Sequence, residues 1–95
     1  MSKPLVTYNA TSGELRNNPD AFAEKGDYVA SIVWEKRKGQ NVGLGDLIAT
    51  IQWGDGSRDP LNAPEGCSGK VKDLNRKIKF EDLEYPPSQF LARIS

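Results

Sequence analysis

Short apolar runs, separated by glycine, proline and charged residues, recur along the whole chain and predict short strands joined by tight turns. The run at 28–34 is the richest in β-branched and aromatic residues, which favour strands. At 47–53 apolar and polar residues alternate, so the apolar ones are expected to share the buried face of a strand. These apolar residues are Leu47, Ala49, Ile51 and Trp53.

Further strands are expected at 5–8, 14–16, 70–74, 76–80 and 90–94, and at 60–64, where two prolines restrict the strand to a sheet edge or a short pairing. One short helix is predicted from Asn18, a suitable N-cap, through Pro19 at the first helical position. Gly26 suits the end of this helix. Because it has only about two turns, it needs packing by Phe22 to persist.

Length and charge limit the possible functions. The 95 residues form one small domain, and 13 basic and 13 acidic residues give a formal net charge of zero. This balance argues against a dedicated nucleic-acid binder. Without histidine the chain cannot form imidazole metal sites or His-based triads, and its single cysteine cannot form an internal disulfide. No apolar run is long enough to span a membrane and no hydrophobic signal segment follows Met1, so the expected location is cytoplasmic.

The chain contains a short internal repeat. Residues 48–51 and 91–94 share the pattern apolar-Ala-polar-Ile, and each follows a turn that is itself preceded by a charged stretch. A duplicated strand–turn–strand unit predicts two similar halves packed face to face. The alternative is a chance match, because a four-residue pattern is short.

The chain from Ile32 onward resembles the biotinyl/lipoyl-like carrier domain family. The resemblance lies in Gly-x-x-Val-x-x-Gly-Asp-apolar-apolar-Ala-x-Ile at 39–51, in Ala63-Pro64-Glu65-Gly66, where the family reads Ala-Pro-x-x-Gly, and in Leu-Ala-x-Ile at 91–94. It implies an all-β, lipoyl-like barrel-sandwich hybrid of two small sheets related by a pseudo-twofold. The expected organisation is a single domain, 1–95, with a core at 28–95 and an N-terminal extension at 1–27 that contains the short helix.

In this family a hairpin carries the lysine that receives biotin or lipoate. Counting forward from Ile51 places the expected acceptor position at Asp55, and counting back from Ala63 places it at Gly56. No lysine occurs between Lys38 and Lys70. Since an amide to either cofactor requires a primary amine, we expect neither biotinylation nor lipoylation, and no cofactor.

The leading hypothesis is therefore a non-enzymatic protein-interaction module with no catalytic or metal-binding residues. Its partner, another protein, would bind the N-terminal extension and the hairpin Trp53, Gly54, Asp55, Gly56, Ser57 and Arg58. Trp53 is either an exposed anchor or, as its strand face favours, part of the core. An Asp55–Arg58 ion pair is expected to close the hairpin, and Cys67 is expected to be inert because no general base accompanies it.

Two alternatives remain open at this stage. The first is an accessory subunit that docks to a carboxylase, a dehydrogenase or another large complex. The second is a small protein associated with nucleic acid or RNA polymerase through a basic edge, formed by Lys36, Arg37, Lys38, Arg76 and Lys77. The zero net charge, and the acidic residues at 81–84, disfavour direct nucleic-acid binding, and solvated turns are the simpler interpretation of the basic residues.

Overall fold

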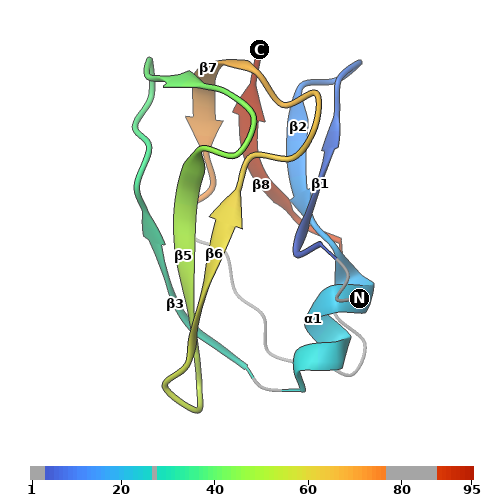
Figure 1. Ribbon diagram of the computed structural model, residues 1–95, viewed down its shortest axis with the longest axis vertical. Coiled ribbons are helices and arrows are strands. Elements are labelled where there is room, and N and C mark those ends of the chain that lie inside the picture. The colour runs from blue at the N-terminus through green and yellow to red at the C-terminus, as the bar shows by residue number, and fades with distance from the viewer. Residues whose placement is uncertain (1–3, 27, 77–87) are drawn as a thin grey trace.

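The computed structural model describes residues 4–26, 28–76 and 88–95. These residues form short strands and one short helix (Figure 1). In chain order the elements are β1 (Val6–Asn9), β2 (Glu14–Asn17), α1 (Pro19–Lys25), β3 (Val29–Trp34), β4 (Asn41–Val42), β5 (Leu47–Trp53), β6 (Arg58–Asn62), β7 (Gly69–Leu74) and β8 (Phe90–Ile94). The mainly β-structure confirms the predicted class. Most of the strand expected at 76–80 lies outside the described residues.

The strands form two antiparallel sheets. The larger has the order β1-β2-β8-β7-β4, and the smaller has the order β3-β5-β6. The chain alternates between them, because β4 lies in the larger sheet although it falls between β3 and β5 in sequence. Strand β2 pairs with β8. The first two strands of the chain therefore belong to the larger sheet.

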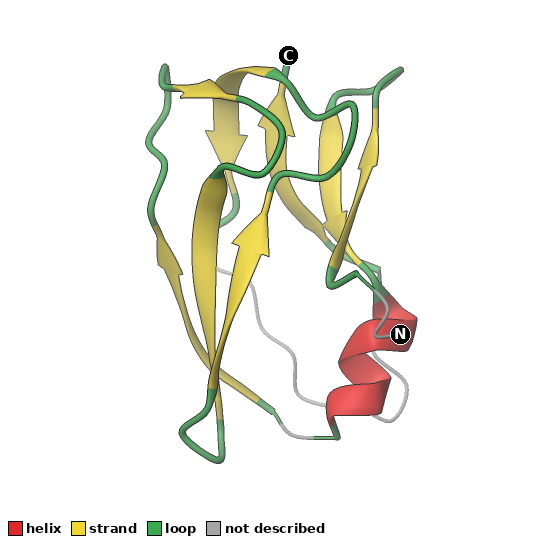
Figure 2. Cartoon of the chain, in the orientation of Figure 1, coloured by secondary structure: helices red, strands yellow, loops and turns green. Residues whose placement is uncertain are grey.

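Helix α1 lies beside one end of the sheets (Figure 2). The Asn18 side chain accepts a hydrogen bond from the Asp20 backbone N–H, and Gly26 ends the helix in the left-handed conformation at φ 71°. Phe22 is fully buried and belongs to the same apolar cluster as the strand residues. These observations confirm the predicted helix, its caps and its packing residue.

Leu47 does not lie on the buried face predicted for it. In the β5–β6 pair, Leu47 is opposite Asn62 and Ala49 is opposite Leu61, so Ile48 is an extra residue on β5. This β-bulge turns both Ile48 and Ala49 into the core, whereas Leu47 is 40% exposed. The alternation holds for the rest of the strand. It fails at Leu47 because the extra residue of the bulge reverses the side of the sheet to which the preceding side chain points.

Strand β8 has a bulge at the equivalent place of the repeat. Phe90 is opposite Arg16 and Ala92 is opposite Leu15, so Leu91 is the extra residue. Leu91 and Ala92 are both fully buried, as are Ile48 and Ala49 in β5. The apolar-Ala pair in each copy of the repeat therefore marks a bulge that directs two successive side chains inward.

The backbone hydrogen bonds around the two bulges also correspond. The Ile48 carbonyl accepts from the Glu35 N–H at 2.8 Å, and the Leu91 carbonyl accepts from the Asn75 N–H at 2.8 Å. Strand β5 pairs with β3 and β6, and β8 pairs with β7 and β2 in the same pattern. The sequence repeat thus has a structural counterpart in the central strand of each sheet.

Candidate functional site

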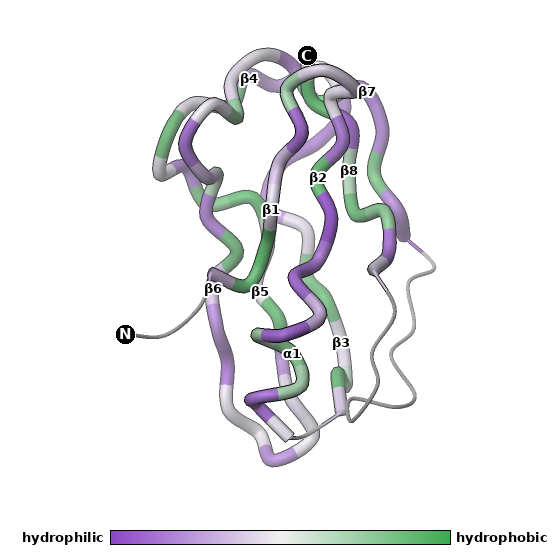
Figure 3. Tube along the Cα trace, turned by 90° about the vertical axis from the view of Figure 1, so that its right-hand side faces the viewer, coloured by the Kyte–Doolittle hydropathy of each residue, from purple (hydrophilic) through white to green (hydrophobic). Residues whose placement is uncertain are grey.

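The loop between β5 and β6 projects past the end of the sheets (Figure 1). The trace of this loop is pale to light purple in Figure 3, between neutral and hydrophilic. The Gly56 N–H donates to the Trp53 carbonyl at 3.0 Å, and the Trp53 N–H donates to the Ser57 carbonyl at 2.9 Å. Gly56 has φ 89°, a conformation that L side chains rarely adopt. The chain therefore forms a defined tip at the place where the resemblance predicts the cofactor-bearing hairpin.

Asp55 lies exposed at this tip and is held by Ser57. Its Oδ1 accepts from the Ser57 backbone N–H at 2.8 Å and from the Ser57 hydroxyl at 2.6 Å. The hydroxyl bond is the largest cause, and the backbone bond the next, of a lowered pKa for the Asp55 carboxyl. Among the described residues no ion pair joins Asp55 to Arg58, so the expectation that Arg58 closes the tip is wrong.

Trp53 is fully buried and cannot serve as an exposed anchor. Its ring packs edge-on against Phe22 of α1, with centroids 5.4 Å apart and an interplanar angle of 69°. The indole N–H donates to Asp59 Oδ2 at 2.7 Å. The core interpretation of Trp53 is therefore correct, and Asp59 supplies the acceptor that a buried indole N–H requires.

Lys25 links the end of α1 to the hairpin, a contact that the sequence analysis missed. Its Nζ donates to Ser57 Oγ at 2.9 Å and lies 3.9 Å from Asp59 Oδ2. The same ammonium lies 5.5 Å from the centre of the Trp53 ring. Lys25 therefore brings an amine to the base of the hairpin, but three neighbours hold that amine in place. No local sequence signal pointed to this contact, because the two segments are far apart in the chain.

Tyr28 is the exposed aromatic residue of the hairpin region. It is 57% exposed, and its carbonyl accepts from the Gly54 N–H at 2.7 Å. A Cβ atom at Gly54 would lie 2.2 Å from a carbon of the Tyr28 ring. The ring therefore covers the backbone at the base of the hairpin, which is possible because position 54 has no side chain.

Two lysines of the predicted basic edge are paired with carboxylates. Lys36 Nζ lies 3.8 Å from Asp46 Oδ2 and donates to the Asn41 carbonyl at 3.1 Å. Lys38 Nζ lies 3.8 Å from Asp73 Oδ1. The turn at 36–38 thus lies against β7, the strand that leads to Arg76. Both lysines of this turn are paired with carboxylates. Arg37 and Arg76 are exposed, and Lys77 lies outside the described residues.

Cys67 is buried, with 1% of its surface exposed. Burial raises the pKa of its thiol from 9.0 to about 11. Because the thiolate is the reactive form, this environment makes Cys67 a poor nucleophile. The structure therefore supports the inert interpretation.

Comparisons with protein-family models, with curated proteins and with solved structures find no match. The described part of the chain has no helix that is long and apolar enough to cross a membrane. In residues 4–26, 28–76 and 88–95, no cluster of three or more histidine, cysteine, aspartate or glutamate side chains is arranged to hold a metal ion. Any assignment of function therefore depends on the hairpin and on the chemistry of its residues.

Proposed function

We propose that this protein is a non-enzymatic interaction module, built on a lipoyl-like barrel-sandwich hybrid whose projecting hairpin carries no prosthetic group. The observation that carries the proposal is the position of Asp55. It lies at the exposed tip between β5 and β6, where the resembling family has its acceptor lysine. A carboxylate cannot form the amide through which lysine holds biotin or lipoate.

The repeated strand pairing supports the proposed scaffold. The family's two halves are related by a pseudo-twofold, which would place equivalent bulges at Ile48 and Leu91 and equivalent hydrogen bonds on their carbonyl groups, as observed. The larger sheet has two edge strands, β1 and β4, without a counterpart in the smaller sheet, and the N-terminal extension supplies β1 and β2. The sheets are therefore unequal in size although their central strands correspond.

Binding at the hairpin would occur through surface contact. Tyr28 and Arg58 are both exposed there, and tyrosine and arginine are enriched among the residues that dominate protein interfaces. The bonds of Asp55 to Ser57 and of Ser57 to Lys25 hold the tip in one conformation. A preformed loop loses less conformational entropy on binding, so these bonds favour recognition by a protein partner.

The first test is whether the protein is modified. We expect no change in intact mass after co-expression with biotin and lipoate ligases, because the tip offers no primary amine. The Asp55→Lys variant provides the positive control, since it introduces an amine at the expected acceptor position. A cofactor-sized increase in the mass of the native protein would contradict the proposal, and a Lys25→Arg variant would show whether Lys25 is the acceptor.

The second test is whether the hairpin binds a partner. We expect a tagged protein to capture partner proteins that are lost when 54–57 are replaced by a two-residue Asn-Gly turn, and reduced by Tyr28→Ala. Thr7→Ala is the matched control, because Thr7 is an exposed strand residue in the other sheet. Equal capture by all four proteins would show that the hairpin is not the binding surface.

A further inference from the structure

Asp55 and Gly56 form the only pair in the sequence in which an aspartate or asparagine directly precedes glycine. An aspartate in this setting can rearrange its own backbone, because the amide nitrogen of the next residue is within reach of its carboxyl group and glycine has no side chain to hinder the approach. In the structure nothing beyond the chain neighbours of Gly56 lies within 4 Å of the position that a Cβ atom would take. Asp55 is also exposed. The hairpin tip therefore presents to solvent the aspartate whose surroundings hinder this rearrangement least.

The rearrangement is a cyclisation that releases water. The Gly56 nitrogen attacks Cγ of the protonated Asp55 carboxyl, the N–Cγ bond forms, and the amide proton leaves with the carboxyl hydroxyl as water. A second water molecule then opens the succinimide ring. Opening at Cγ restores aspartate, whereas opening at the main-chain carbonyl carbon of Asp55 gives isoaspartate, in which the backbone runs through the former side chain. The reaction needs no oxidant, reductant or cofactor and leaves the final mass unchanged.

Hydrogen bonds hold both reacting groups in the folded chain. Asp55 Oδ1 accepts from the Ser57 hydroxyl at 2.6 Å and from the Ser57 N–H at 2.8 Å. The Gly56 N–H donates to the Trp53 carbonyl at 3.0 Å. The Ser57 hydroxyl oxygen in turn accepts from Lys25 Nζ at 2.9 Å. Ring closure turns the carboxyl toward the Gly56 nitrogen and removes the proton of that nitrogen, so these bonds have to break first.

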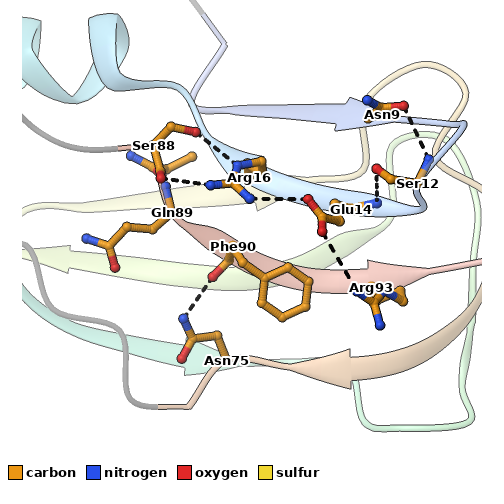
Figure 4. A network of polar contacts seen from close by, with 10 residues as sticks. Asn9, Ser12, Glu14, Arg16, Asn75, Ser88, Gln89, Phe90 and Arg93 are labelled. Carbon is orange, nitrogen blue, oxygen red and sulfur yellow. Dashed lines mark hydrogen bonds and ion pairs between the residues drawn. The ribbon is translucent and has the colours of Figure 1, made fainter.

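The turn between β1 and β2 contains a similar arrangement without the glycine. Asn9 Oδ1 accepts from the Thr11 N–H at 2.9 Å and from the Ser12 N–H at 3.3 Å (Figure 4). The residue after Asn9 is Ala10, whose methyl group hinders attack by its own nitrogen. At the hairpin tip this steric protection is absent, so the hydrogen bonds alone restrain Asp55.

We propose that Asp55 is the site of isoaspartate formation in this chain, and that the Ser57 hydroxyl restrains the reaction in the folded state. The Ser57 hydroxyl bond, followed by the backbone bond, also lowers the pKa of the Asp55 carboxyl, so less of it is in the protonated form that loses water. Removal of one exposed hydrogen bond of ordinary strength should speed ring closure by about 3–10-fold. This inference concerns the covalent chain and does not depend on the hairpin's proposed binding.

The test follows isoaspartate at position 55 while the protein is stored for weeks near neutral pH. Peptides that contain this position are separated by chromatography, because isoaspartate changes retention but not mass, and resistance to an aspartate-specific protease identifies it. We expect slow conversion in the native protein, conversion about 3–10-fold faster in Ser57→Ala, and conversion at least as fast as in that variant when the native chain is unfolded in guanidinium chloride. Ser57→Thr retains the hydroxyl and is the matched control, which should convert as slowly as the native protein.

Circular dichroism identifies variants that remain folded. If Ser57→Ala unfolds, the comparison of native and unfolded chains still shows whether the folded tip restrains the reaction. Conversion of the native protein as fast as the unfolded chain would overturn the proposal, as would equal rates in the native protein and a folded Ser57→Ala variant. Isoaspartate that forms at another residue of the unfolded chain but not at Asp55 would overturn the assignment of the site.

Discussion

The ring of Tyr28 lies directly across Gly54, so closely that a Cβ atom at Gly54 would lie 2.2 Å from a ring carbon. The two residues also share a backbone hydrogen bond of 2.7 Å, from the Gly54 N–H to the Tyr28 carbonyl. An aromatic ring that covers a glycine on a neighbouring strand replaces the packing that the missing side chain cannot provide. This contact connects the segment before β3 to the base of the hairpin.

The Gly54→Ala variant should be destabilised by about 1 kcal/mol, because the added methyl group forces the Tyr28 ring away from the hairpin. Chemical denaturation measures this loss. In a Tyr28→Ala background the same substitution should be nearly neutral, since the clash is then absent. If Gly54→Ala lowered the free energy of unfolding equally in the two backgrounds, the Tyr28 ring would not be the reason why position 54 requires glycine.

Asp59→Ala should lower the free energy of unfolding by about 1–3 kcal/mol, because it leaves the buried indole N–H of Trp53 without its acceptor. Asp59→Asn retains an acceptor oxygen and should cost clearly less. Lys25→Gln removes the partly exposed ion pair to Asp59, together with the ammonium's contacts to Ser57 and to the Trp53 ring, and should cost no more than about 1 kcal/mol. Thermal or chemical unfolding of the three variants provides the comparison, and equal effects of Asp59→Ala and Asp59→Asn would contradict this role of Asp59.

Ile48→Ala should destabilise the protein by about 2–5 kcal/mol, because it opens a cavity among buried side chains. Leu47→Ala, one residue earlier, should cost less than about 1 kcal/mol, because Leu47 is exposed on the other side of the bulge. Equilibrium unfolding of both variants decides between the bulged strand and a regular one. A regular alternating strand would reverse the two values.

Cys67 should react slowly with iodoacetamide in the native protein and rapidly after unfolding. Raising the pKa of the thiol from 9.0 to about 11 lowers its thiolate population near neutral pH about 100-fold. The folded state retains this proton at a pH where the unfolded state releases it. The corresponding contribution to stability is therefore present below pH 9 and is lost as the pH rises toward about 11. Alkylation followed by mass spectrometry measures the reactivity of the thiol, and rapid labelling of the native protein at neutral pH would contradict its predicted low reactivity. Unfolding experiments between pH 9 and about 11 measure the predicted loss of stability.

Local sequence signals located most of the elements. Asn18, Pro19 and Gly26 predicted the helix because capping and positive φ depend on individual residues and their neighbours. The alternation at 49–53 predicted which side of β5 is buried. The hairpin tip at Asp55 and Gly56 followed from residues that tolerate tight turns. These features need little information from distant parts of the chain.

The hairpin's surroundings were not predictable in the same way. Lys25 reaches Ser57 across 32 positions of sequence, and the Tyr28 ring covers Gly54 across a similar separation. The neutralisation of Lys38 by Asp73 also joins distant segments. Such contacts depend on how sheets and helix pack, so no local pattern at either partner indicates them.

The sequence by itself determined the class of fold, the helix, the turns and the absence of lysine from the hairpin, because each follows from residue type and short-range periodicity. Only the tertiary structure decided that Tyr28 is exposed, that Ile48 rather than Leu47 enters the core, and that the first strands join the larger sheet. The physical reason is that burial depends on what packs above each residue. That is decided by strand register and by contacts between segments far apart in the chain.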